Sequence, residues 1–299
     1  MIDLRYHIAS LVGIFLALGL GILIGSTIVG DNLLVDQQKK MIDRLEQQFY
    51  SLRERENDLV ATNNYKDQII ANYENYSQTL LPPLVKEHLV DYKIALVVSG
   101  GSDVPAGMLN ALSVAGAQVT SKAVVLANMN LDSAELLERV RAFYKADKNV
   151  SKDVLRQYLA GSVALAITNQ AEPELIKFIQ SNEIIKFSGD NSIPLNGVIV
   201  LGGTNNVSSN FASSFDHALI GALSSTGVKM FGVEKSDAVY SYMPEFQKNN
   251  ISTIDNVNLS PGQISLVYAM EGEPGHYGIK ATAKQFMPSL PVETINEKP

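Results

Sequence analysis

The segment KIALVVSGG, from Lys93 to Gly101, decides the fold of the larger part of this 299-residue chain. A short, continuously apolar run that ends in glycines is typical of a buried strand in a parallel sheet. Pro105 follows closely and marks the first turn of a helix. A second strand is predicted around Gln118 to Leu126. This order of elements indicates an α/β domain with a mainly parallel, Rossmann-like sheet.

The same order of elements returns later in the chain. NGVIVLGG, from Asn196 to Gly203, is again an apolar run with two final glycines, and a helix and a strand near 228–233 are expected to follow. The nonapeptides ALSVAGAQV (111–119) and ALSSTGVKM (222–230) share Ala, Leu, Ser and Gly at identical offsets. The match predicts duplicated halves of one sheet or two adjoining subdomains. Unrelated βαβ units also share this order of strand, turn and helix, and they give a similar pattern.

Three further helices and one further strand complete the predicted domain. The helices are expected over about 132–146, 152–168 and 173–182, with Ser151 as the N-cap of the second. ISLVYAM (264–270) is short and apolar, which predicts a final strand of the sheet. The α/β domain is expected to extend over residues 90–290, and residues 291–299 are predicted to be a disordered tail.

The N-terminal part of the chain predicts a membrane helix. From Ile8 to Val29 there are 22 residues without a charge. As a helix they would extend about 33 Å, enough to cross about 30 Å of hydrocarbon. A cleaved signal peptide is the alternative, because Arg5 supplies a basic flank. No A-x-A-like cleavage site follows the run, so residues 1–30 are predicted to form a permanent transmembrane anchor.

Small residues follow one face of this predicted helix at every fourth position: Ala9, Gly13, Ala17, Gly21 and Gly25. In lipid such a stripe lets a second helix backbone approach closely. Glycine and alanine are also common in membrane helices without any such role. Five small residues in series nevertheless favour self-association of the helix.

Residues 31–82 are predicted to form a coiled-coil stalk. Leu45, Leu52 and Leu59 follow one another at the heptad spacing of seven, while the second core series contains many polar residues. Pro82 and Pro83 are expected to end the helix. A helix with so few apolar positions pairs with a copy of itself, lies against another protein or folds back on the C-terminal domain. Together with the membrane stripe, the heptads predict a parallel homodimer.

Composition excludes several functions. The formal net charge of −7 and the lack of a concentrated basic segment argue against nucleic-acid binding, and the absence of cysteine excludes thiolate metal sites and cysteine nucleophiles. Neither GGSDVPAG (100–107) nor GGTNN (202–206) is a dinucleotide fingerprint or a P-loop, and G-x-S-x-G is absent. We therefore expect no enzyme and no bound organic cofactor.

The histidines give one weak metal-ligand candidate. His7, His88, His217 and His276 are far apart and form no H-x-H or H-E-x-x-H motif. His276 lies in GEPGHYG, where the neighbouring glycines would expose its ring. A structural loop histidine that bonds to the backbone is the simpler interpretation.

Two stretches carry a family resemblance. DLRYHIASLVGIFLALGLGILIGS (3–26) and STIDNVNLSPGQISLVYAM (252–270), followed by GEPGHYG, resemble the bacterial copper transport family of the mycobacterial outer-membrane channel type, MctB. The residues that carry the resemblance are Arg5, His7, Asp255, Asn256, Pro261, Gly262, Gly275, His276, Tyr277 and Gly278. The resemblance implies a single-span membrane protein with an extracytoplasmic C-terminal domain and a role in copper efflux or envelope copper homeostasis.

Charge alone leaves the membrane orientation open. Arg5 lies on one side of the apolar run, and Lys39, Lys40 and Arg44 lie on the other among acidic residues. The alternative function is a non-enzymatic envelope scaffold or regulator, which would act through its coiled coil on a cell-wall or cell-separation partner.

Overall fold

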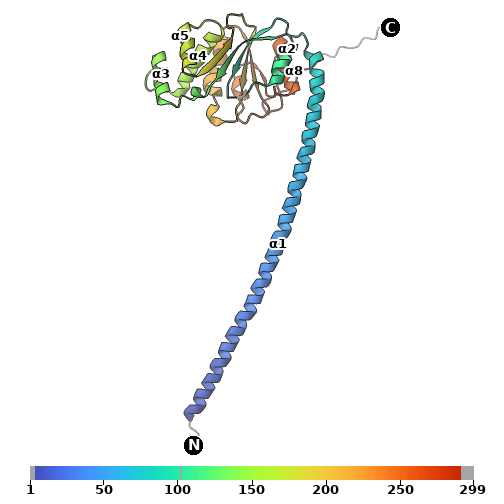
Figure 1. Ribbon diagram of the computed structural model, residues 1–299, viewed down its shortest axis with the longest axis vertical. Helices are drawn as coiled ribbons and strands as arrows, with labels where there is room; N and C mark the ends of the chain where they lie inside the picture. The colour runs from blue at the N-terminus through green and yellow to red at the C-terminus, as the bar shows by residue number, and fades with distance from the viewer. Residues whose placement is uncertain (1–3, 102, 291–299) are drawn as a thin grey trace, which may run out of the picture. The chain divides into compact units, whose positions relative to one another are not determined.

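The computed structural model describes residues 4–101 and 103–290 (Figure 1). The chain divides into two compact units, Met1–Ala71 and Asn72–Pro299. The described part of the first unit is a helix, and the second unit holds helices and a sheet. The predicted α/β class is confirmed, whereas the predicted tail at 291–299 lies outside the described residues.

Helix α1 (Leu4–Val85) runs without interruption through the predicted anchor and the predicted stalk. Its segment Arg5–Thr27 has a mean hydropathy of 2.5 and is long and apolar enough to cross a membrane. From residue 34 to residue 68 every side chain is exposed. The predicted coiled coil and homodimer require a second copy of the chain and stay predictions.

The predicted end of α1 is wrong, because the helix continues through Pro82 and Pro83 to Val85. Proline removes one backbone donor from a helix, but tertiary packing can outweigh that loss. Leu81 and Val85 are buried in the hydrophobic core of the second unit. This packing holds the last turn of the helix in place.

In the described part of the chain seven strands form one sheet, in the order β3-β2-β1-β4-β5-β6-β7. Neighbouring strands are parallel except for the antiparallel pair β2 and β3, so the predicted mainly parallel sheet is confirmed. The strands are β1 (Lys93–Val98), β2 (Gln118–Val125), β3 (Ile185–Gly189), β4 (Gly197–Gly202), β5 (Lys229–Glu234), β6 (Ser252–Ile254) and β7 (His276–Tyr277).

Two hydrophobic layers cover the two faces of the sheet. Side chains alternate along β1, so that Ala95 and Val97 join one layer and Ile94 and Leu96 join the other. The first layer packs under α3 (Ala134–Tyr144), α4 (Lys152–Ile167), α5 (Pro173–Ser181), α6 (His217–Ser224) and α7 (Met243–Gln247). The second packs under α2 (Ala106–Val114), α8 (Ser260–Glu271) and the end of α1.

The segment predicted as the final strand is instead the middle of α8. Every residue from 262 to 270 is buried, so the helix has no solvent-exposed face and no amphipathic period that would reveal it. Pro261 occupies the first turn, where proline favours helix initiation. That signal distinguishes the helix from a strand.

The two similar nonapeptides lie in corresponding elements. The first covers the end of α2 and the start of β2, and the second covers the end of α6 and the start of β5. Helices α2 and α6 pack on opposite faces of the sheet, as in doubly wound folds generally. The duplication therefore stays a prediction.

Candidate functional site

The carboxyl ends of β1 and β4 lie where the strand order reverses, which is the usual ligand site of a doubly wound sheet. Gly100 and Gly203 follow these strands with φ angles of 74° and 77°. A Cβ on Gly100 would lie 2.6 Å from the carbonyl oxygen of Gly203. The two loops touch here, so positive φ and close approach explain these glycines without a bound phosphate.

A buried hydrogen-bonded group of side chains, Ser99 and Asp216, lies at the end of β1. Asp216, the last residue of the short π-helix η3 (Ala212–Asp216), accepts a hydrogen bond at Oδ2 from Ser99 Oγ at 2.9 Å. No described residue bonds to its Oδ1. Burial raises the pKa of Asp216 to about 7, against a smaller lowering by the Ser99 bond. Burial and the charge of Asp216 also raise the pKa of Tyr242. The side chains of Ser99, Asp216 and Tyr242 are fully buried, which is consistent with a structural role.

A second buried carboxylate anchors the segment that follows β7. Glu234, at the end of β5, accepts hydrogen bonds from Ser241 Oγ at 2.7 Å, from the Tyr242 amide at 2.8 Å and from Lys280 Nζ at 2.7 Å. Lys280 Nζ also donates to the carbonyl oxygen of Ala238 at 3.0 Å. Loss of one partner would leave a buried charge without compensation, so this ion pair fixes the loop to the sheet.

The structure brings two of the family-motif residues into contact. Asp255 follows β6, and its carboxylate accepts hydrogen bonds from the backbone amides of Ile279 at 2.7 Å and Lys280 at 2.9 Å. Gly278 packs directly on this carboxylate, where any Cβ would overlap it. Asp255 and Gly278 therefore stabilise the turn after β7, and they offer no free ligand group.

The other motif residues near α8 and β7 also have packing roles. Pro261 and Gly262 form the first turn of α8, and Gly262 lies against Asn256 where a side chain would overlap the backbone. Both amide atoms of the fully buried Asn256 lack a partner among the described residues. A Cβ on Gly275 would lie 2.5 Å from the ring of Tyr277, so a larger residue would displace that ring.

Arg5, His7 and the small residues of the membrane segment belong to the first unit. Arg5 and His7 are exposed at the start of α1. The Cβ positions of Gly13, Gly21 and Gly25 meet no atom within 4 Å. Leu45, Leu52 and Leu59 are likewise exposed along the helix. The role of these residues in helix pairing stays a prediction.

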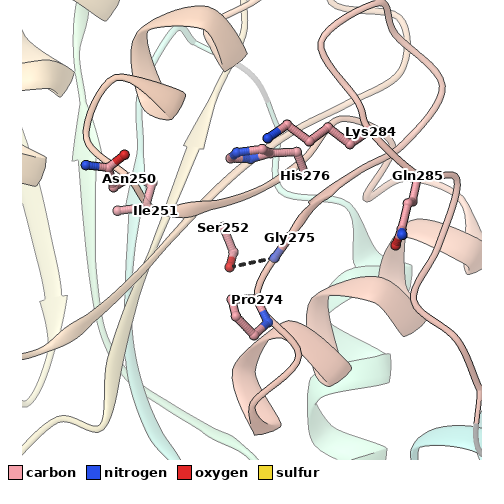
Figure 2. Close-up of a pocket in the computed structure, with 8 residues that line it drawn as sticks. All are labelled: Asn250, Ile251, Ser252, Pro274, Gly275, His276, Lys284 and Gln285. Atoms are coloured by element: carbon pink, nitrogen blue, oxygen red, sulfur yellow. Dashed lines mark hydrogen bonds between the residues drawn. The ribbon is translucent and has the colours of Figure 1, made fainter.

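His276 lies at a cavity of about 390 Å³ beside the amino ends of β6 and β7 (Figure 2). Its Nδ1 atom is 2.9 Å from Thr253 Oγ1. Burial, and to a lesser degree the charge of Lys284, lowers the pKa of His276. The imidazole is therefore uncharged at neutral pH, next to the ammonium of Lys284.

The surroundings of His276 do not suit a copper ion. Within residues 4–101 and 103–290 no three His, Cys, Asp or Glu side chains lie close enough together to hold a metal ion. No carboxylate or methionine lines the cavity, and the ammonium of Lys284 repels cations. His276 is thus a single nitrogen donor without partner ligands.

Sequence reasoning missed Glu74 and Lys284. Glu74 Oε1 accepts hydrogen bonds from the amide and the hydroxyl of Ser260, at 3.0 and 2.7 Å, at the start of α8. The partners are 186 residues apart, so no local pattern reveals the contact. Lys284 meets His276 through a loop that returns to β7, and its sequence neighbourhood carries no motif.

Comparison with known protein families gives one match. The model of the family described as "Copper transport outer membrane protein, MctB" matches residues 1–288. Comparison with curated proteins finds no significant match. The family match extends over the first unit and residues 72–288 of the second, and it includes all residues that carry the resemblance noted in the sequence.

Proposed function

Because the chain belongs to the MctB family of copper transport outer membrane proteins, we propose that it is held in a membrane by one N-terminal helix and serves copper efflux or envelope copper homeostasis. The family implies a role in copper transport or homeostasis, and its match over residues 1–288 is the observation that carries the proposal. In this proposal the C-terminal domain lies outside the cytoplasm, and the protein is not an enzyme.

The apolar start of α1 supports the membrane anchor. Arg5–Thr27 comprises 23 residues, enough to cross a bilayer as a helix. One helix cannot enclose a pore, so transport through this segment would need several copies or a partner protein. The proposed homodimer, paired through the membrane stripe and the stalk, packs its two helices closely and encloses no channel by itself.

Topology provides the first test. Protease added to intact spheroplasts is expected to degrade the second unit and to leave a fragment that contains the membrane segment. A C-terminal domain that is cleaved only after the membrane is permeabilised would overturn the extracytoplasmic placement. Recovery of the mature chain as a soluble protein without residues 1–30 would overturn the anchor.

Copper binding provides the second test. The detergent-solubilised chain is titrated with Cu(I) and with Cu(II), together with His276→Ala and with His217→Ala as the matched control. Submicromolar binding that is lost only in His276→Ala would support direct copper handling, with further ligands supplied by a second copy or a partner. Absence of binding would leave indirect copper homeostasis or the second function below.

A second function is favoured by the exposed stalk. Apolar side chains such as Met41, Leu52 and Leu59 are more than half exposed on α1. With no assembled copper site in the described residues, the protein would act as a non-enzymatic envelope scaffold or regulator through this stalk. A cell-wall or cell-separation protein that is recovered with the wild-type chain and lost with Leu52→Asp would support this alternative.

A further inference from the structure

The cavity beside His276 has walls that are hydrogen-bonded to one another. It lies at the amino edge of the sheet, where Ser252 begins β6 and His276 begins β7 (Figure 2). Ser252 Oγ accepts a hydrogen bond from the Gly275 amide at 3.3 Å, and the carbonyl oxygen of His276 accepts one from the Lys284 amide at 2.8 Å. Its volume of about 390 Å³ lies within the range of small-molecule sites.

A hydrogen bond with Thr253 orients the ring of His276. Gln247 Nε2 donates to Thr253 Oγ1 at 3.2 Å, so the hydroxyl hydrogen of Thr253 is free to point at His276 Nδ1, 2.9 Å away. A neutral imidazole that accepts at Nδ1 carries its hydrogen on Nε2. With Thr253 as the donor in this hydrogen bond, His276 presents an N–H donor on the side of its ring away from Thr253.

Lys284 adds a positive charge next to this donor. In Figure 2 its side chain runs beside the ring of His276, and the nitrogen ends of both point towards Asn250. Lys284 forms no ion pair with a carboxylate of the described residues. No aspartate or glutamate lines the cavity, whereas the amides of Asn250 and Gln285 do.

A neighbouring cavity is also lined by a lysine. It has a volume of about 510 Å³, shares Asn250 and Ser252 with the first cavity, and is lined by Lys229. Lys229 likewise pairs with no carboxylate in the part of the chain that the structure describes. In a chain with a formal net charge of −7, two exposed lysines without a carboxylate partner among the described residues, Lys229 and Lys284, line adjoining cavities at this edge of the sheet.

We propose that this cavity binds a small soluble oxyanion, a phosphate or carboxylate group, between the ammonium of Lys284 and the Nε2–H of His276. Charged donors form the stronger hydrogen bonds to such oxygens, and the cavity presents donors without a competing carboxylate. The inference goes beyond copper handling and does not depend on it, because the ammonium that attracts an anion repels a metal cation.

Calorimetric titration of the full chain in detergent tests the proposal. Inorganic phosphate and acetate are the two probes, at pH 7 and constant ionic strength set with chloride. Saturable binding of phosphate, of acetate or of both is expected, and the pattern identifies the preferred oxyanion. Lys284→Gln should weaken binding about tenfold or more, the value of one charge-assisted hydrogen bond. Lys148→Gln, which changes an exposed lysine of another loop, should bind like the wild type.

A spectroscopic measurement locates the ligand. In the chain labelled at its histidine rings, phosphate or acetate should shift the resonances of His276 and leave those of His217 unchanged. The proposal is overturned if neither anion binds saturably, if Lys284→Gln binds as tightly as the wild type, or if the His276 resonances do not move. Unchanged unfolding of Lys284→Gln would show that weaker binding reflects the lost charge and not a misfolded protein.

Discussion

One helix of this protein lies in two different environments. Between residues 34 and 68 every side chain of α1 is exposed, although Leu45, Leu52 and Leu59 are apolar. Near its end, Leu81 and Val85 are 2% and 0% exposed in the core of the second unit. The end of α1 is thus stabilised by its own chain. The earlier stretch needs lipid or another protein for comparable burial, because isolated amphipathic helices gain most of their stability from packing.

The largest expected effect follows from a charge placed in the buried end of the helix. Val85→Asp should destabilise the second unit by about 4 kcal/mol, because Val85 is fully buried in the hydrophobic core and a carboxylate there would lose its hydration. Val60→Asp, at an exposed position of the same helix, is the matched control and should change stability by less than about 0.5 kcal/mol. Denaturant unfolding followed by near-UV circular dichroism measures both. Equal free energies of unfolding for Val85→Asp and Val60→Asp would contradict the conclusion that only the end of α1 is packed in the core of the second unit.

The pH dependence of unfolding distinguishes the two units, because the described groups outside the membrane segment whose pKa values are shifted lie in the second unit. The pKa of Asp216 is about 7 in the folded chain, above its ordinary value of 3.8. The folded state therefore keeps a proton that the unfolded state releases. Stability contributed by this group is complete below about pH 4, falls as the pH rises to about 7 and is level above that.

Asp216→Asn removes that dependence. The amide keeps an acceptor for Ser99 and has no charge to bury. At pH 8 the variant should be more stable than the wild type by about 4 kcal/mol, and the difference should shrink towards pH 4. Denaturant midpoints at both pH values give the result. An unchanged pH profile would show that Asp216 is ionised in the folded protein at neutral pH.

A smaller effect is expected where α1 caps another helix. Glu74→Gln weakens the hydrogen bonds from Ser260 at the start of α8 and removes a negative charge that favours a helix N-terminus. The second unit should lose about 1 kcal/mol of stability. Glu54→Gln makes the same chemical change at an exposed site in the first unit and should have no effect. Equal values for the two variants would show that the cap contributes nothing.

The sequence predicted elements whose signals are local. β1 and β4 are continuous apolar runs before glycines, and Ser151 caps α4 as expected, with its side chain accepting from the Val154 amide. The segment 264–270 was predicted wrongly because a helix buried on all sides has no period to detect. The predicted helix end at Pro82 is wrong because packing of the last turn in the core stabilises the helix beyond this proline. Local sequence does not reveal that packing.

The site was harder to predict than the fold. The motif residues were found through family resemblance, but their roles depend on contacts between distant segments. Asp255 stabilises the turn at Ile279 and Lys280, and His276 gains its charged neighbour only when the chain returns to β7. Strand pairing creates both arrangements, and spacing along the chain does not specify them. The heptad spacing of Leu45, Leu52 and Leu59, in contrast, is visible in the sequence alone, and the coiled coil that it predicts stays a prediction.

The smallest expected effect on the second unit accompanies a large effect on assembly. Leu52→Asp changes a residue that is 62% exposed, so the stability of the second unit should stay within about 0.5 kcal/mol of the wild type. In the proposed dimer the same side chain lies at the seam, where a carboxylate faces its own copy and loses apolar burial.

A fragment that begins at Asp31 should sediment as a dimer at tens of micromolar concentration, and Leu52→Asp should make it monomeric. Asn57→Asp, at the exposed heptad position opposite this seam, should remain dimeric. A wild-type fragment that sediments as a monomer would refute the contribution of the stalk, and the exposed leucines would then have to be covered by a different protein.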